Sequence, residues 1–82
     1  MSVDPPPPWV LTARRAFGDR IRDARLAAGL SQERLGELVD ADRKTIHRIE
    51  YAISDPPLTL LFRIARAVGV PLSELVSEDD CE

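Results

Sequence analysis

The chain has 82 residues, of which 44% are hydrophobic and only 5% aromatic, and its formal net charge at pH 7 is −3. This length predicts one domain, and the aliphatic composition favours helices packed around Leu, Ile, Val and Ala over a β-sandwich or barrel. Because Cys81 is the single cysteine, an internal disulfide and a multi-cysteine zinc site are excluded.

The first residues resemble neither a secretion signal nor a membrane span. A signal would begin with a basic patch and an apolar run, whereas here Asp4 precedes the four prolines Pro5 to Pro8, and no apolar stretch is long enough to cross a bilayer. We therefore expect a cytoplasmic protein. The prolines favour an extended conformation, which predicts a flexible Pro-rich arm over residues 1–12. Trp9 within it is expected either to pack against the domain or to stay exposed.

The charges are distributed unevenly along the chain. All 11 Lys and Arg lie between Ala13 and Leu72 together with 8 acids, so this stretch carries +3 and the flanking residues carry −6. A basic middle keeps nucleic-acid binding open despite the acidic total. The acids after Glu74 predict an acidic C-terminal tail over residues 77–82, either solvated or bound to a partner.

Three helices are predicted first, in the order of the chain. Thr12 caps a helix that begins at Ala13, and Gly29 ends it in a left-handed conformation. Ser31 and Asp42 cap a second and a third helix, both short. The apolar residues at helical spacing, which we expect to face the core, are Phe17, Ile21, Ala24, Ala28, Leu35, Leu38, Val39, Ile46 and Ile49.

Two further helices are predicted after Pro56 and Pro57, which stop any continuation of the third. The fourth helix closes at Gly69, and a last turn or two over 71–76 brings Leu72 and Leu75 onto the core. The inward stripe of the fourth helix comprises Leu58, Leu61, Phe62, Ile64, Ala65 and Val68. Residues 13–76 are therefore expected to form one all-α domain of five helices.

The second and third helices are separated by only three or four residues, within the segment QERLGELVDADRKTIHRIEY at 32–51. Two helices that cross steeply over so short a turn require a small residue where they press together. Gly36 supplies it, although a glycine inside a helix costs about 1 kcal/mol. This pattern predicts a helix-turn-helix.

Residues 17–76 resemble the helix-turn-helix domain of the Cro/phage-repressor (XRE) family, which has a five-helix lambda-repressor-like fold. The resemblance lies in GLSQERL around the start of the second helix, TIHRIE on the third, and LLFRIARAVGVPLSEL through the last two. It implies a sequence-specific transcriptional regulator that binds a palindromic operator in double-stranded DNA as a homodimer. It also implies no enzymatic activity, no cofactor and no metal.

The resemblance places the third helix in the DNA major groove, with its N-terminal residues near base edges. The candidates for base readout are Arg43, Lys44, His47 and Arg48, whose alternative role is a solvated helix face.

Four other residues have roles implied by the resemblance. Gln32, at the first position of the second helix, is expected to bond a DNA phosphate. Thr45 is expected either to bond a phosphate or to stabilise the first turn of its helix. Arg25 and Glu50 are expected to form a structural ion pair between the first and third helices.

The sequence departs from the family pattern at several positions. Asp40 replaces the usual turn glycine, Ala52 replaces the glycine after the third helix, and Arg34 replaces a capping acid, which leaves Ser31 capping alone. Because Asp tolerates left-handed geometry better than Ala, the turn should be kept and the end of the third helix reshaped. Asp55 would repel phosphates, so we expect modest phosphate affinity and greater dependence on dimerisation.

Leu60 lies off the inward stripe and predicts either extra core or, with Leu72 or Val76, an apolar dimer patch. Two alternative functions stay open. One is a protein-interaction module or antitoxin-like protein that binds a protein partner through the Pro-rich arm or the acidic tail. The other, within DNA binding, is a restriction-modification controller protein. No nucleophile and base can be assembled around His47, the only histidine.

Overall fold

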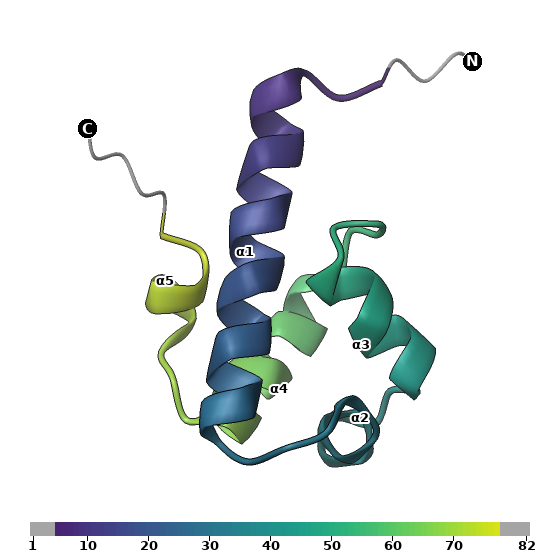
Figure 1. The fold of residues 1–82 in the computed structure, drawn as a ribbon, viewed down its shortest axis with the longest axis vertical. Helices are drawn as coiled ribbons and strands as arrows, with labels where there is room; N and C mark the ends of the chain where they lie inside the picture. The colour runs from purple at the N-terminus through teal and green to yellow at the C-terminus, as the bar shows by residue number, and fades with distance from the viewer. Residues whose placement is uncertain (1–4, 78–82) are drawn as a thin grey trace.

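A computed structural model describes residues 5–77, which contain five α-helices and no strand. The helices are α1 (Pro8–Ala27), α2 (Gln32–Val39), α3 (Arg43–Glu50), α4 (Leu58–Val68) and α5 (Leu72–Leu75). In Figure 1, α1 stands in the middle, with α5 on one side and the α2–α3 pair on the other. This confirms the all-α, five-helix prediction. Residues 1–4 of the predicted arm and 78–82 of the acidic tail, Cys81 included, lie outside the described residues.

Local capping explains where the helices begin and end. The Ser31 hydroxyl accepts a hydrogen bond from the Arg34 N–H at 2.9 Å at the start of α2, and the Asp42 carboxylate accepts one from the Thr45 N–H at 2.8 Å at the start of α3. Gly29 and Gly69, with φ of +74° and +76°, take the left-handed conformation after α1 and α4. These four helix ends are those predicted from the sequence.

The start of α1 was predicted wrongly. The helix begins at Pro8 rather than Ala13, and the Thr12 hydroxyl donates back to the Pro8 carbonyl at 3.2 Å instead of capping. Proline suits the first helical position, since its φ is already helical and the N–H that it lacks would have no partner there. The predicted arm is therefore wrong for residues 8–12. Trp9 lies on this added turn with 65% of its surface exposed.

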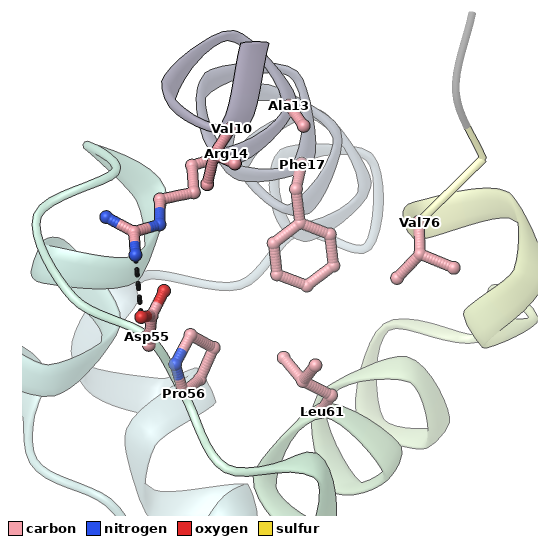
Figure 2. A pocket seen from close by; sticks show the side chains of 8 residues that line it. All are labelled: Val10, Ala13, Arg14, Phe17, Asp55, Pro56, Leu61 and Val76. Carbon is pink, nitrogen blue, oxygen red and sulfur yellow. Dashed lines mark hydrogen bonds and ion pairs between the residues drawn. The ribbon is translucent and has the colours of Figure 1, made fainter. Parts of the chain in front are cut away.

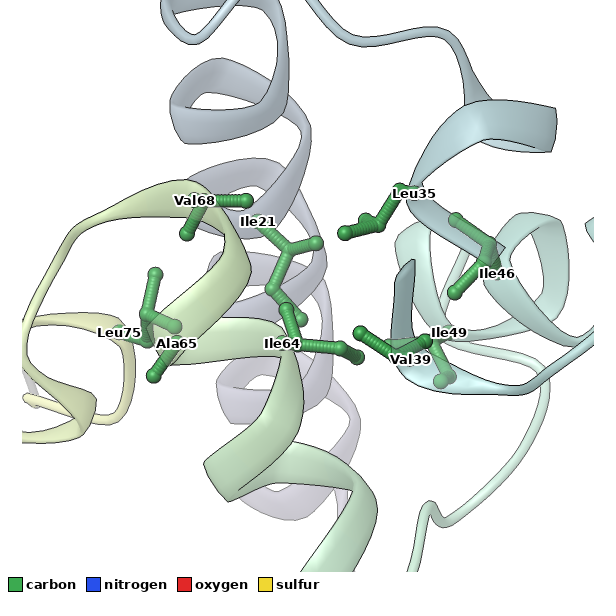
Figure 3. Packing of buried hydrophobic residues seen from close by; sticks show 9 residues of the cluster. All are labelled: Ile21, Leu35, Val39, Ile46, Ile49, Ile64, Ala65, Val68 and Leu75. Atoms are coloured by element: carbon green, nitrogen blue, oxygen red, sulfur yellow. The ribbon is translucent and has the colours of Figure 1, made fainter. Parts of the chain in front are cut away.

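The core is aliphatic and draws on every helix. In Figure 3, Ile21 and Ile64 lie in the middle, with side chains of α2 and α3 to one side and of α4 and α5 to the other. The buried set, all predicted from the sequence, is Ile21, Leu35, Val39, Ile46, Ile49, Ile64, Ala65, Val68 and Leu75. Residues far apart in the chain are thus held in one cluster.

Four residues expected to face the core are exposed instead. Ala28 lies beyond the last residue of α1. Leu38 is exposed because the buried side of α2 is the one that carries Leu35 and Val39. Leu58 and Phe62, one turn apart on α4, are 59% and 55% exposed because α4 buries a narrower face than its apolar stripe. Leu60 packs partly buried against the core, which favours the extra-core alternative over the dimer patch.

Two glycines let backbones approach where no side chain would fit. A Cβ on Gly36 would lie 2.5 Å from the Ala41 carbonyl oxygen, so the predicted small residue is indeed required at the turn. A Cβ on Gly18 would lie 2.8 Å from the Ile49 carbonyl oxygen and would also clash with that of Glu50. The C-terminal end of α3 therefore rests directly on the backbone of α1, a close contact that sequence analysis did not foresee.

Candidate nucleic-acid interface

The exposed side of α3 carries the four residues proposed from the sequence for base readout. One side of this helix is buried through Ile46, Ile49 and Glu50, so its other side must face solvent. There, exposed side chains line a shallow depression of about 280 Å³, formed by Arg43, Lys44, His47 and Arg48. We call these four residues the basic face of α3. Three fixed cations beside one imidazole suit a polyanionic ligand.

The first turn of α3 is held by Asp42 and Thr45. One oxygen of the Asp42 carboxylate accepts from the Thr45 hydroxyl at 2.7 Å and from the Thr45 N–H at 2.8 Å. These bonds, the hydroxyl bond foremost, lower the pKa of Asp42 below its ordinary value, so the cap stays ionised at neutral pH. The Thr45 hydroxyl therefore donates to Asp42 and stabilises the first turn, while its expected contact with a phosphate stays a prediction.

The structure places a buried ion pair between α1 and α3. The Arg25 Nε donates to Glu50 Oε2 at 2.6 Å and its Nη2 donates to Oε1 at 3.1 Å, while Nη1 donates to the Leu30 carbonyl at 2.9 Å. The two side chains are 9% and 0% exposed. The bidentate geometry fixes the rotation of α3 about its own axis, and with it the direction of the basic face.

Gln32 at the start of α2 joins the same network. Its Nε2 donates to Glu50 Oε1 at 3.1 Å, which turns the amide nitrogen toward the carboxylate and leaves a second N–H. The side chain is half-buried. The phosphate contact expected of Gln32 stays a prediction, whereas its bond to Glu50, 18 residues away, is one that no local pattern indicates.

Asp55, which is expected from the sequence to repel phosphates, is paired with a cation in the structure. Figure 2 shows the Arg14 side chain reaching from α1 to this loop, where its Nη2 lies 2.6 Å from the Asp55 Oδ2. The pair borders an apolar groove lined by Phe17, Pro56 and Leu61. Exposed pairs of this kind add little stability, but Arg14 offsets the charge that would repel a phosphate.

The end of α3 also differs from expectation. Asp40 takes the left-handed conformation as predicted, with φ of 62°, but Ala52 does so too, with φ of 61°. The predicted reshaping is therefore wrong. The Ala52 N–H donates to the Ile49 carbonyl at 3.2 Å and the Ile53 N–H to the Arg48 carbonyl at 2.8 Å, the paired bonds of a Schellman motif. They hold an alanine in a conformation that costs about 1 kcal/mol or more.

Tyr51 is an exposed aromatic residue that the sequence analysis did not assign. It caps the C-terminal end of α3, is 56% exposed, and its ring centroid lies 4.5 Å from that of His47. Its position four residues after His47 was the signal that could have placed it beside the basic face.

Within residues 5–77, no cluster of His, Cys, Asp and Glu has the arrangement of a metal site. None of the helices described there combines the length and hydropathy of a membrane span.

Comparison with known proteins identifies relatives that match most of the described residues. The family model described as helix-turn-helix matches residues 21–75. An uncharacterized HTH-type transcriptional regulator of Archaeoglobus fulgidus is 36% identical over 77% of this chain and 90% of its own length. The cryptic phage CTXphi transcriptional repressor RstR of Vibrio cholerae is 31% identical over 78% of this chain, which spans only 58% of that repressor.

A solved structure is similar as well. The restriction-modification controller protein C.AhdI from Aeromonas hydrophila matches with a TM-score of 0.75 and 32% identity, over 79% of this chain and 94% of that one.

The buried pair generates a stability prediction. In Glu50→Ala, the nearly buried guanidinium of Arg25 loses its carboxylate, so the free energy of unfolding should fall by about 3 to 5 kcal/mol. The matched control is Glu37→Ala, which removes an exposed carboxylate 3.0 Å from Arg34 and should cost less than about 1 kcal/mol. Urea unfolding measures both. Equal losses in the two variants would contradict a structural role for the buried pair.

Proposed function

Because the chain belongs to the helix-turn-helix family of transcriptional regulators, we propose that it binds a specific sequence of double-stranded DNA through α3 in the major groove. The observation that carries this proposal is the basic face, exposed on a helix whose other side is locked into the core. An α-helix of this width fits the major groove, which is about 12 Å wide. We also propose that the protein is not an enzyme.

The chemistry of the basic face supports base readout. Arg43 and Arg48 carry guanidinium forks and Lys44 an ammonium group, and these donors match guanine O6 and N7. Arg43 is the first residue of α3, which makes it the member of the set best placed for a phosphate instead. His47 adds an imidazole N–H.

Gln32 is proposed as a phosphate contact. It is the first residue of α2, where unpaired backbone N–H groups and the helix dipole favour an anion. Its second amide N–H is a further donor. Such a contact fixes the position of the protein on DNA but carries no sequence information.

A homodimer on a palindromic operator is proposed because one recognition helix reads only a few base pairs. The exposed pair Leu58 and Phe62, rather than the partly buried Leu60, supports an apolar contact on α4. The relatives come from bacteria and archaea, in which such a regulator would work in the cytoplasm.

A second candidate function is that of a restriction-modification controller. The similarity to C.AhdI over 94% of its length favours it. A gene located beside those for a restriction endonuclease and a methyltransferase would support this role. Repulsion of phosphates by Asp55 would favour the alternative of a protein-interaction module, through the arm or the acidic tail. The pairing of Asp55 with Arg14 weakens that argument.

The first prediction here separates base readers from phosphate contacts. On a duplex selected from a random DNA pool, Lys44→Ala and Arg48→Ala should each lose about 1 to 3 kcal/mol, with little loss on a scrambled duplex. Gln32→Ala should weaken both duplexes modestly and alike, with little change in the salt slope because the amide carries no charge. The measurement is fluorescence anisotropy at two salt concentrations.

The control for these titrations is Arg66→Ala, which removes an exposed cation from the last turn of α4 and should leave binding to both duplexes nearly unchanged. If alanine variants of all four residues of the basic face bind the selected duplex as the parent does, α3 does not lie in the major groove.

The second prediction concerns the dimer. Sedimentation should give a homodimer for the parent at micromolar concentration and a monomer for Phe62→Glu, because a carboxylate would be buried in an apolar contact. The control Thr59→Glu, at another exposed position of α4, should stay dimeric. A parent that sediments as a monomer at high concentration would contradict the proposed dimer.

A further inference from the structure

Tyr51 is exposed at a position where the fold does not use it. The buried residues of α3 are Ile46, Ile49 and Glu50, and Tyr51 is absent from the core and its partly buried surroundings. Its contact is with His47, at 4.5 Å between ring centroids and with ring planes 35° apart. A large aromatic side chain that lies outside the core and packs against a residue of the basic face suggests a role in that face.

The position of Tyr51 continues the basic face by one turn. Lys44, His47, Arg48 and Tyr51 are spaced at i, i+3, i+4 and i+7, which places them along one side of the helix. From Lys44 to Tyr51 the helix rises by about 10 Å, roughly the height of three base pairs. Tyr51 therefore lies one turn beyond His47 on the side of α3 that carries the basic face.

The contact restricts the imidazole without using its hydrogen-bonding atoms. An exposed His side chain samples several rotamers, and its N–H groups lie in the plane of the ring. Packing between ring faces leaves those nitrogens free at the edge. An aromatic pair of this kind changes an equilibrium constant by about two- to tenfold. We expect a gain of this size in DNA affinity when the His47 ring is already oriented before the DNA binds.

We propose that Tyr51 is a positioning residue for base readout, which holds the His47 ring so that an imidazole N–H donates to N7 of a purine. The inference rests on the proposed function, since it requires α3 in the major groove. N7 is an acceptor on both adenine and guanine there, so His47 would favour a purine over a pyrimidine at one position.

The test uses the full chain, the selected duplex and a duplex in which 7-deazapurine replaces one purine at a time. For the parent, every deaza position that faces a donor of the basic face should weaken binding, because the substitution removes only the N7 acceptor. The position read by His47 should weaken binding about tenfold, and its effect should be the one that disappears in His47→Ala. Tyr51→Phe keeps the ring and should bind as the parent does. Tyr51→Leu should lose about two- to tenfold on the selected duplex, with an unchanged salt slope.

The decisive comparison combines the variants. In His47→Ala, 7-deazapurine at the position read by His47 should no longer weaken binding. Adding Tyr51→Leu to this variant should cause no further loss of affinity. Independent losses that multiply would overturn the proposal, as would a Tyr51→Leu variant that binds like the parent. A loss in Tyr51→Phe that is equal on the selected and the scrambled duplex would overturn it in favour of a phosphate contact by the hydroxyl.

Two measurements separate this inference from folding and from the proposed function. A nuclear Overhauser effect between the two rings should be present in the parent and in Tyr51→Phe, and thermal melts should show all the variants folded. If Arg48→Ala loses selective binding while Tyr51→Leu does not, the proposed function holds and the inference fails. If the parent selects no sequence, both fail.

Discussion

The buried carboxylate of Glu50 is the constraint on which the arrangement of this fold depends. A carboxylate with no exposed surface requires a cation and hydrogen-bond donors, and Arg25 supplies both through a bidentate contact at 2.6 and 3.1 Å. Gln32 and the Leu30 carbonyl complete the network. One charge therefore ties α1, the start of α2 and the end of α3 together, and Gly18 makes room for the approach.

This constraint connects the core to the exposed surface. With Glu50, Ile46 and Ile49 held inward, the side chains of Lys44, His47 and Arg48 have only the solvent side of α3 available. The cap by Asp42 and the Schellman bonds after Glu50 fix the two ends of the same helix. The basic face is therefore preorganised, which reduces the conformational entropy lost on binding.

Local signals in the sequence predicted much of this architecture. Ser31, Asp42, Gly29 and Gly69 marked helix ends because capping depends on a few neighbouring residues, and helical spacing identified the nine core side chains. Helical spacing does not give the width of the face that a helix buries, so the prediction that Leu58 and Phe62 face the core was wrong. The contacts between Arg14 and Asp55 and between Gly18 and α3 join distant parts of the chain, which no local pattern reveals.

Methylation interference on the selected duplex tests most directly whether α3 lies in the major groove. Methylation of guanine at N7 blocks an acceptor in the major groove, and methylation of adenine at N3 blocks one in the minor groove. If α3 reads the major groove, N7-methylated guanines within each half-site should be depleted from the bound DNA, while N3-methylated adenines at the same base steps should be retained. Depletion of N3-methylated adenines alone would place the protein in the minor groove and contradict the account.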